Sequence, residues 1–284
     1  QIQVIKTSEG YSSVNGLPAG TPLSGAIFAV YDKQNNVVDK FQTNENGIGS
    51  SKKLPLGIYT VKEVQAPANY GLNPTVFTAD IEFAGQVVKL NVTDPVITAG
   101  VSIKKTGYAQ TMNNNIMRWT VSGVRNDSTT SLQSFYWRDT LPTDAVRLTR
   151  LVTGTYSTTQ TYKVTFTTNL NSQWRTAYDN LSTAKNYTLD MSSAALGLAS
   201  NEYVTQFMLS FGIVPAGFHQ LTNATVDAQT LYALTNGYKF TNKADVGGLL
   251  GGNWVQSIAR WTTSVYSHYV PAKPAAPKSP KLPR

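Results

Sequence analysis

The stretch YTVKEVQAPANY, residues 59–70, has the pattern of one β-strand that runs into a Pro-containing turn. Because side chains alternate between the two faces of a strand, Tyr59, Val61 and Glu63 share one face. Tyr and Val indicate that this face packs against a core. A carboxylate in the same row must find a buried partner or stay protonated. The rest of the chain must therefore supply a buried partner for Glu63.

The composition predicts an all-β protein large enough for two domains. The chain has 284 residues, of which 41% are hydrophobic and only 14% charged, and Thr, Ser, Asn, Gly, Val and Tyr dominate. This usage is typical of many short strands joined by turns. The chain has no cysteine, so disulfides and thiolate metal sites are excluded. Such a protein is either cytosolic, or exported and stabilised in some other way.

Residues 1–97 read as one small β-domain. Short β-rich segments recur and are separated by turn residues such as the Asn-Gly pair that ends at Gly47. This spacing favours a β-sandwich. The segments are residues 2–6, 26–31, 37–38, 59–65, 76–81 and 87–92.

In two further strands of this domain, an ionisable side chain lies on the same face as apolar residues, as Glu63 does in its own strand. Lys6 shares a face with Ile2 and Val4 in the first strand, and Asp94 shares one with Val92 in the last. Each group alone has an ordinary explanation, such as a snorkelling lysine, a turn-capping aspartate or a salt bridge at a sheet edge. Three such coincidences in one domain favour a shared buried site.

The motifs that carry these residues resemble the Cna B-type domains of Gram-positive surface proteins and pilins. The similar segments are PLSGAIFAVYD, TNENG, LPLGIYTVKEVQAPANY and VTDPV, and together they cover about residues 1–97. Their most specific part is the Glu-x-x-Ala-Pro-x-x-Tyr stretch that ends at Tyr70.

The resemblance implies an intramolecular isopeptide bond between Lys6 and Asp94, promoted by Glu63. In this family a lysine of the first strand joins an Asn or Asp side chain of the last strand, more often an Asn. Asn91 is the rival acceptor, but it lies on the opposite face of its strand. The chemistry is reasonable, because burial disfavours the charged forms of both amine and acid and packing holds the reactants together.

A second domain, residues 98–270, repeats the pattern of a lysine, an acid and an asparagine on apolar strand rows. Its motifs are Lys105-Thr106, Asp139-Thr140-Leu141-Pro142 and the segment TNKADV, residues 241–246. They resemble the Cna A-type or repeat-type surface domains, the other isopeptide class. The implied bond is Lys105–Asn242 with Asp139 as promoter. Lys104 is the alternative nucleophile, on the wrong face, and Asp139 could instead begin a turn before Leu-Pro.

The remaining segments are an insertion and a tail. Residues 150–235 match the family poorly and are expected to form an insertion around the second sandwich, with short helices near 194–198 and 227–234. Residues 271–284, PAKPAAPKSPKLPR, are too rich in proline to pack a core and should form an extended wall-spanning spacer. The final LPR is similar to a truncated sortase sorting motif.

Several classes of function lack the residues that they need. The net charge is +8, part of it in the basic tail, but no basic motif interleaved with aromatics indicates nucleic-acid binding. The two histidines, His219 and His268, have no metal-ligand spacing, and no phosphate loop or nucleophile elbow occurs. No apolar run is long enough to span a bilayer. We therefore expect no metal, no cofactor and no turnover enzyme.

The sequence as a whole predicts two tandem immunoglobulin-like β-sandwich domains, the second with an insertion, followed by a Pro-rich tail. The resemblance implies a structural subunit anchored to the Gram-positive cell wall, most like a minor basal pilin, with other pilin subunits and, through sortase, peptidoglycan as partners. The alternative is an adhesin module that binds a host protein or glycan, which exposed aromatics in residues 150–235 would support. An enzyme of another kind would need a separate pocket with converging acids.

Overall fold

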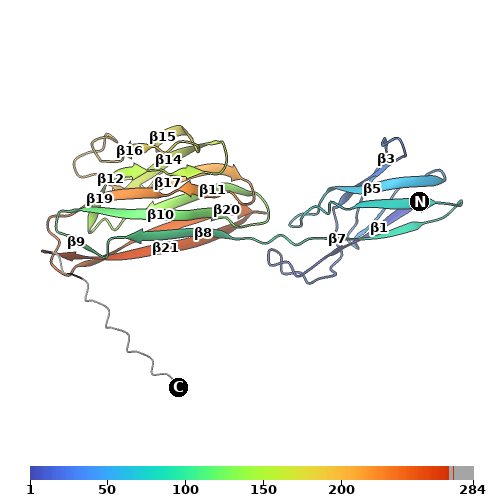
Figure 1. The fold of residues 1–284 in the computed structure, drawn as a ribbon, viewed down its shortest axis with the longest axis horizontal. Helices are drawn as coiled ribbons and strands as arrows, with labels where there is room; N and C mark the ends of the chain where they lie inside the picture. Colours follow the sequence, from blue (N-terminus) through green and yellow to red (C-terminus); the bar gives the residue numbers. More distant parts are fainter. Residues whose placement is uncertain (269–270, 272–284) are drawn as a thin grey trace, which may run out of the picture.

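The computed structural model describes residues 1–268 and 271. Figure 1 shows two β-rich bodies arranged end to end and joined by an extended segment that leads from β7 (Val88–Asp94) into β8 (Val101–Gly107). Every regular element in the described residues is a strand, as the all-β prediction requires. The Pro-rich tail and sorting motif, expected at 271–284, lie outside the described residues apart from Pro271.

The first domain encloses one hydrophobic core between two small sheets. Its other strands are β1 (Ile2–Ser8), β2 (Ile27–Tyr31), β3 (Val37–Gln42), β4 (Ile48–Ser50), β5 (Gly57–Gln65) and β6 (Val76–Ile81). The sheet orders are β4-β1-β7 and β3-β2-β5-β6. Each fully buried large apolar side chain contributes about 1.5–3 kcal/mol to folding. The buried apolar residues include Ile2, Val4, Phe28, Val30, Tyr59, Val61 and Val92.

The first and last strands of this domain are neighbours. β1 pairs with β7 in parallel, from Ile2 opposite Val88 to Ser8 opposite Asp94. Alternate residues of β1 are buried, as the sequence pattern predicts, and so is the row of β5 that ends at Glu63. The chain therefore enters and leaves the domain along two adjacent strands.

The second domain encloses a larger core between a five-stranded and a seven-stranded sheet. The sheet orders are β16-β12-β19-β10-β8 and β15-β14-β17-β11-β20-β21-β9, and β13 and β18 form a separate pair. The remaining strands are β9 (Gln110–Met112), β10 (Ile116–Asn126), β11 (Leu132–Thr140), β12 (Val146–Val152), β13 (Thr155–Tyr156), β14 (Thr161–Thr168), β15 (Arg175–Ser182), β16 (Thr188–Asp190), β17 (Val204–Val214), β18 (Gln220–Thr222), β19 (Ala224–Thr230), β20 (Lys239–Leu250) and β21 (Asn253–Tyr266).

Residues 150–235, expected as an insertion around the sandwich, are instead built into both of its sheets. β17 lies between β14 and β11 in the seven-stranded sheet, and β19 lies between β12 and β10 in the five-stranded sheet. The prediction of two short helices in this segment is wrong. Residues 194–197 form turns, and 227–230 belong to β19, where alternate apolar side chains pack into the core. Tertiary burial here overrides a weak local helix preference.

Candidate functional sites

Three strands of the first domain bring Lys6, Glu63 and Asp94 together inside it. Lys6 lies on β1, Glu63 on β5 and Asp94 on β7, and all three side chains are fully buried. Lys6 Nζ forms an ion pair and a hydrogen bond with Asp94 Oδ1 and lies 3.0 Å from Glu63 Oε1. The three side chains that strand alternation places on core-facing sides therefore meet in one buried cluster.

The surroundings of this cluster are apolar on one side and sparsely hydrogen-bonded on the other. Lys6 Nζ lies 5.4 Å from the centre of the Phe28 ring. The backbone N–H of Asn73 donates to Glu63 Oε2 at 2.7 Å, which fixes the second oxygen of that carboxyl. Asp94 Oδ2 is buried with no hydrogen-bond partner, and Glu63 Oε1 contacts Lys6 outside hydrogen-bonding geometry.

Gly47 holds the backbone of Lys6 close to a turn. Its carbonyl accepts a hydrogen bond from the N–H of Lys6 at 2.8 Å. Its φ is +70°, and a Cβ added there would lie 2.3 Å from the carbonyl oxygen of Lys6. Only glycine fits both conditions. The sequence predicts the turn at Gly47, but its contact with Lys6 depends on how the turn and β1 meet in the fold.

The electrostatics of this site favour a protonated acid. Burial raises the pKa of the Asp94 carboxyl to about 7, and Glu63 adds to this rise while Lys6 opposes it. One ammonium and two carboxylates would leave an excess negative charge in an apolar interior, which is costly. A shared proton removes this excess. Asn91, the rival acceptor, is exposed to solvent, as its position on the opposite face predicts.

The second domain contains a similar cluster of Lys105, Asp139 and Asn242. Lys105 lies on β8, Asp139 on β11 and Asn242 on β20. Lys105 Nζ donates to Asp139 Oδ2 at 2.5 Å, and Asn242 Nδ2 donates to Asp139 Oδ1 at 2.8 Å. The aspartate therefore bridges the amine and the amide with one oxygen each. The side chains of Lys105 and Asp139 are fully buried, and Asn242 is inaccessible to solvent.

Burial also tunes the second cluster. Burial lowers the pKa of the Lys105 amine, and Asp139 opposes this effect without cancelling it. Lys105 Nζ lies 5.6 Å from the centre of the Trp119 ring. Trp119 can approach because residue 107 is glycine, since a Cβ there would lie 2.6 Å from Trp119 Cδ1. Lys104, the alternative nucleophile, is exposed on the other face of β8.

Each cluster pairs an amine with a carbonyl group and a carboxyl that can move protons. The oxygen of the acceptor amide, Asn242 Oδ1, is buried without a hydrogen-bond partner. An amine that shares a buried cluster with a carboxyl or an amide, with water excluded, is arranged for condensation to an amide. Within residues 1–268 and 271, no group of three or more metal-ligating side chains occurs, and no helix is long and apolar enough to cross a membrane.

Comparison with known proteins finds similarity for the first domain. Residues 5–96 match the family model described as SpaA, prealbumin-like fold domain. A stretch of 69 residues is 41% identical to the trypsin-resistant surface T6 protein of Streptococcus pyogenes serotype M6. That stretch covers 24% of this chain and 13% of the T6 protein.

Solved pilin structures are similar over most of the chain but only loosely. The major pilin subunit BcpA of Bacillus cereus is 14% identical, with a TM-score of 0.30 over 93% of this chain and 68% of that one. The RrgB pilus protein of Streptococcus pneumoniae is 14% identical, with a TM-score of 0.34 over 89% of this chain and 48% of that one.

Proposed function

We propose that this chain, whose first domain carries the SpaA prealbumin-like fold, is a structural pilin subunit of a Gram-positive cell surface, locked by two internal isopeptide bonds. The family match and the similarity to the streptococcal T6 surface protein support the pilin assignment. The observation that carries the proposal is the fully buried contact of Lys6 with both Glu63 and Asp94.

In the first domain the bond forms by loss of water. The neutral amine of Lys6 attacks Cγ of the protonated Asp94 carboxyl. Glu63 accepts the proton released from the attacking nitrogen and delivers it to the departing hydroxyl, which leaves as water. The product replaces a buried ammonium and carboxylate by a neutral amide, which removes their desolvation cost. Proximity lowers the barrier, since both groups are already in contact.

In the second domain the bond forms by loss of ammonia. Lys105 passes a proton to Asp139 and becomes a neutral nucleophile, as its lowered pKa favours. Its nitrogen attacks Cγ of Asn242. Asp139 protonates the departing amide nitrogen, which leaves as ammonia, and then accepts the extra proton of the attacking nitrogen, so that a neutral amide remains. Both reactions occur once in each molecule, so the protein matures itself and does not turn over a substrate.

The topology makes the first bond effective against stretching. β1 and β7 are adjacent parallel strands, and Lys6 and Asp94 lie near the same end of the pair. A force applied between Gln1 and the segment after Asp94 is transmitted through the first six residues and then directly across the bond. Residues 7–93 then carry no load. Such a domain suits a stalk that resists extension.

The second bond leaves one hairpin unprotected. A pull that enters through β8 crosses from Lys105 to Asn242 and shields the residues between them. The remainder of β20 and all of β21 lie beyond the bond and pair with each other. This hairpin can peel away under load, while the rest of the domain stays folded.

We further propose that the subunit occupies a minor, basal position and is joined to other pilin subunits and to peptidoglycan by sortase. The similarity to pilins supports this cell-surface location. A second candidate function, an adhesin module that binds a host protein or glycan, is favoured by one observation, a hollow on the outer face of the seven-stranded sheet of the second domain.

Single-molecule stretching between the chain ends tests the proposed function. The proposal predicts no extension from residues 7–93, and at most the release of the terminal hairpin from the second domain. Full extension of both domains at ordinary unfolding forces would overturn it. Lys6→Ala and Lys105→Ala are the matched variants, and each should restore the extension of its own domain.

A further inference from the structure

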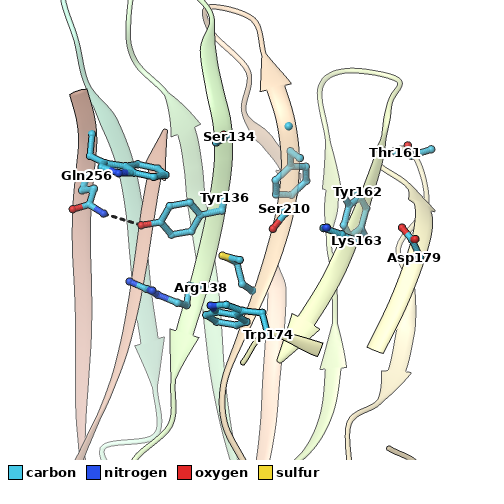
Figure 2. A pocket seen from close by; sticks show the side chains of 14 residues that line it. Ser134, Tyr136, Arg138, Thr161, Tyr162, Lys163, Trp174, Asp179, Ser210 and Gln256 are labelled. Atoms are coloured by element: carbon cyan, nitrogen blue, oxygen red, sulfur yellow. Dashed lines mark hydrogen bonds between the residues drawn. The ribbon is translucent and has the colours of Figure 1, made fainter. Parts of the chain in front are cut away.

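The outer face of the seven-stranded sheet carries a hollow of about 740 Å³, and no residue that lines it belongs to either lysine cluster. Figure 2 shows four of the side chains that line it: Tyr136 and Arg138 on β11, with Ser210 of β17 to one side and Gln256 of β21 to the other. The volume lies within the range of about 300–1,000 Å³ that is typical of small-molecule sites. The hollow is open along the sheet rather than enclosed.

The floor of the hollow is low because small residues lie where the pairing of two strands is irregular. β11 and β17 lose regular register where Phe135 lies opposite Gly212. Ser134 and Gly212 have φ of 50° and 72°, and a Cβ added at Gly212 would meet nothing within 4 Å. Ser210 continues the floor opposite Tyr136. Bulges of this kind re-aim side chains and open space on a sheet face.

Aromatic rings form the walls of the hollow. Trp254 is 53% exposed and Trp174 is 39% exposed, although both belong to a well-packed domain. The ring of Trp254 stands at 74° to that of Tyr136 with centroids 5.8 Å apart. Gln256 Nε2 donates to Tyr136 Oη at 2.9 Å, and Tyr136 Oη donates to Asp245 Oδ2 at 3.1 Å. The platform is therefore rigid before any ligand arrives.

The charges around the hollow balance. Arg138 is engaged by Asp245, with hydrogen bonds of 3.0 and 2.9 Å. The remaining charged groups in the lining are one cation, Lys163, and one anion, Asp179. The lining also offers hydroxyl groups, which both donate and accept hydrogen bonds. The site therefore suits a ligand that is uncharged but rich in hydroxyls.

We propose that this hollow binds a neutral oligosaccharide. The C–H face of a pyranose carries partial positive charge and stacks on the negative face of an aromatic ring. The exposed indoles of Trp174 and Trp254 supply two such faces, and Gln256, Asp179 and Ser210 can meet the sugar hydroxyls. A phosphate or an acidic glycan would need a net positive lining, whereas here Asp245 engages Arg138 and the lining offsets Lys163 with one acid, Asp179. An apolar peptide would leave its polar groups unpaired.

This inference is independent of the proposed cross-links. The lysine clusters are buried inside the sandwiches, whereas the hollow lies on an outer sheet face. Loss of sugar binding would leave the mass of the cross-linked chain unchanged. The two proposals can therefore fail separately.

The test is binding of the full chain to an array that carries neutral oligosaccharides of glucose, galactose, mannose and N-acetylhexosamines. Two other sets of probes are included. Sialylated and sulfated glycans test for charged ligands, and unfolded gelatin peptides test for peptide ligands. We expect binding to a neutral glycan class, with a change in the fluorescence of the exposed tryptophans. Trp254→Ala and Trp174→Ala should each weaken this binding about tenfold or more.

Two further variants keep the test decisive. Tyr232→Ala is the matched control, because that ring is 83% exposed but lies outside the hollow, and it should bind as the parent does. Ser210→Phe fills the floor without removing a wall, and it should abolish binding. All variants should retain the melting temperature of the parent. Absence of neutral-glycan binding, recognition of only charged glycans or peptides, or binding that survives both tryptophan variants would overturn the inference.

Discussion

Replacing Glu63 by glutamine should leave the first domain folded but without its cross-link. Glutamine is nearly isosteric with glutamate, and its carbonyl can still accept the hydrogen bond that the N–H of Asn73 donates at 2.7 Å. It cannot take a proton from the amine and return it to the leaving group. Lys6 and Asp94 then remain as separate side chains.

The expected loss of stability follows from the length of the loop that the bond closes. Lys6 and Asp94 are 88 residues apart in sequence. By the chain-entropy relation for cross-links, closing such a loop stabilises the fold by about 4.5 kcal/mol. In a domain of this size each kcal/mol shifts the melting temperature by about 4–8 °C. Glu63→Gln should therefore lower the melting temperature of the first domain by about 20 °C or more.

Calorimetry of the full chain, with the mass of the same denatured sample, measures both effects. The variant should gain the mass of one water relative to the parent, apart from the substitution itself, and its first domain should melt earlier. Asp80→Asn is the matched control, because this exposed acid lies on β6 away from the cluster. A variant that keeps both the water deficit and the parent melting temperature would refute the role of Glu63.

Three further changes test the chemistry. Asp139→Asn should block the second bond and restore the mass of one ammonia. Asn242→Asp should still react, and its linked product should have the same mass as the linked parent, because water then leaves in place of ammonia; a mass higher by one water would refute this. Lys6→Met leaves Asp94 free, with a pKa raised by burial and by Glu63 above its unfolded value of 3.8. A raised acid pKa stabilises the fold at low pH, and that contribution is lost as the pH rises through the folded pKa, so the unfolding free energy of Lys6→Met should fall as the pH rises from about 4 to beyond about 7. A flat profile in urea titrations would contradict that assignment.

Strand parity was sufficient to select the residues of both clusters. Lys6, Glu63 and Asp94 each occupy an apolar row, and charged residues on such rows are rare unless they are paired. The same argument separated Lys105 from Lys104, which is exposed. The face on which a strand residue lies depends only on its position within the strand, so it can be predicted from the sequence.

Other features depend on long-range pairing that local patterns do not encode. The parallel pairing of β1 with β7 joins the two ends of the first domain, and no local spacing signals it. β17 and β19 were missed as central strands, because their neighbours in the sheets are distant in sequence. The hollow was missed for the same reason, since Trp174, just before β15, and Trp254, on β21, line one hollow only when strands distant in sequence are assembled in one sheet.

The mass of the intact, denatured chain is the most direct test of the cross-linked pilin account. We predict that it falls short of the mass calculated from the sequence by one water plus one ammonia. Each deficit should disappear in the matching variant, Lys6→Ala or Lys105→Ala. A chain of full calculated mass would contradict the account.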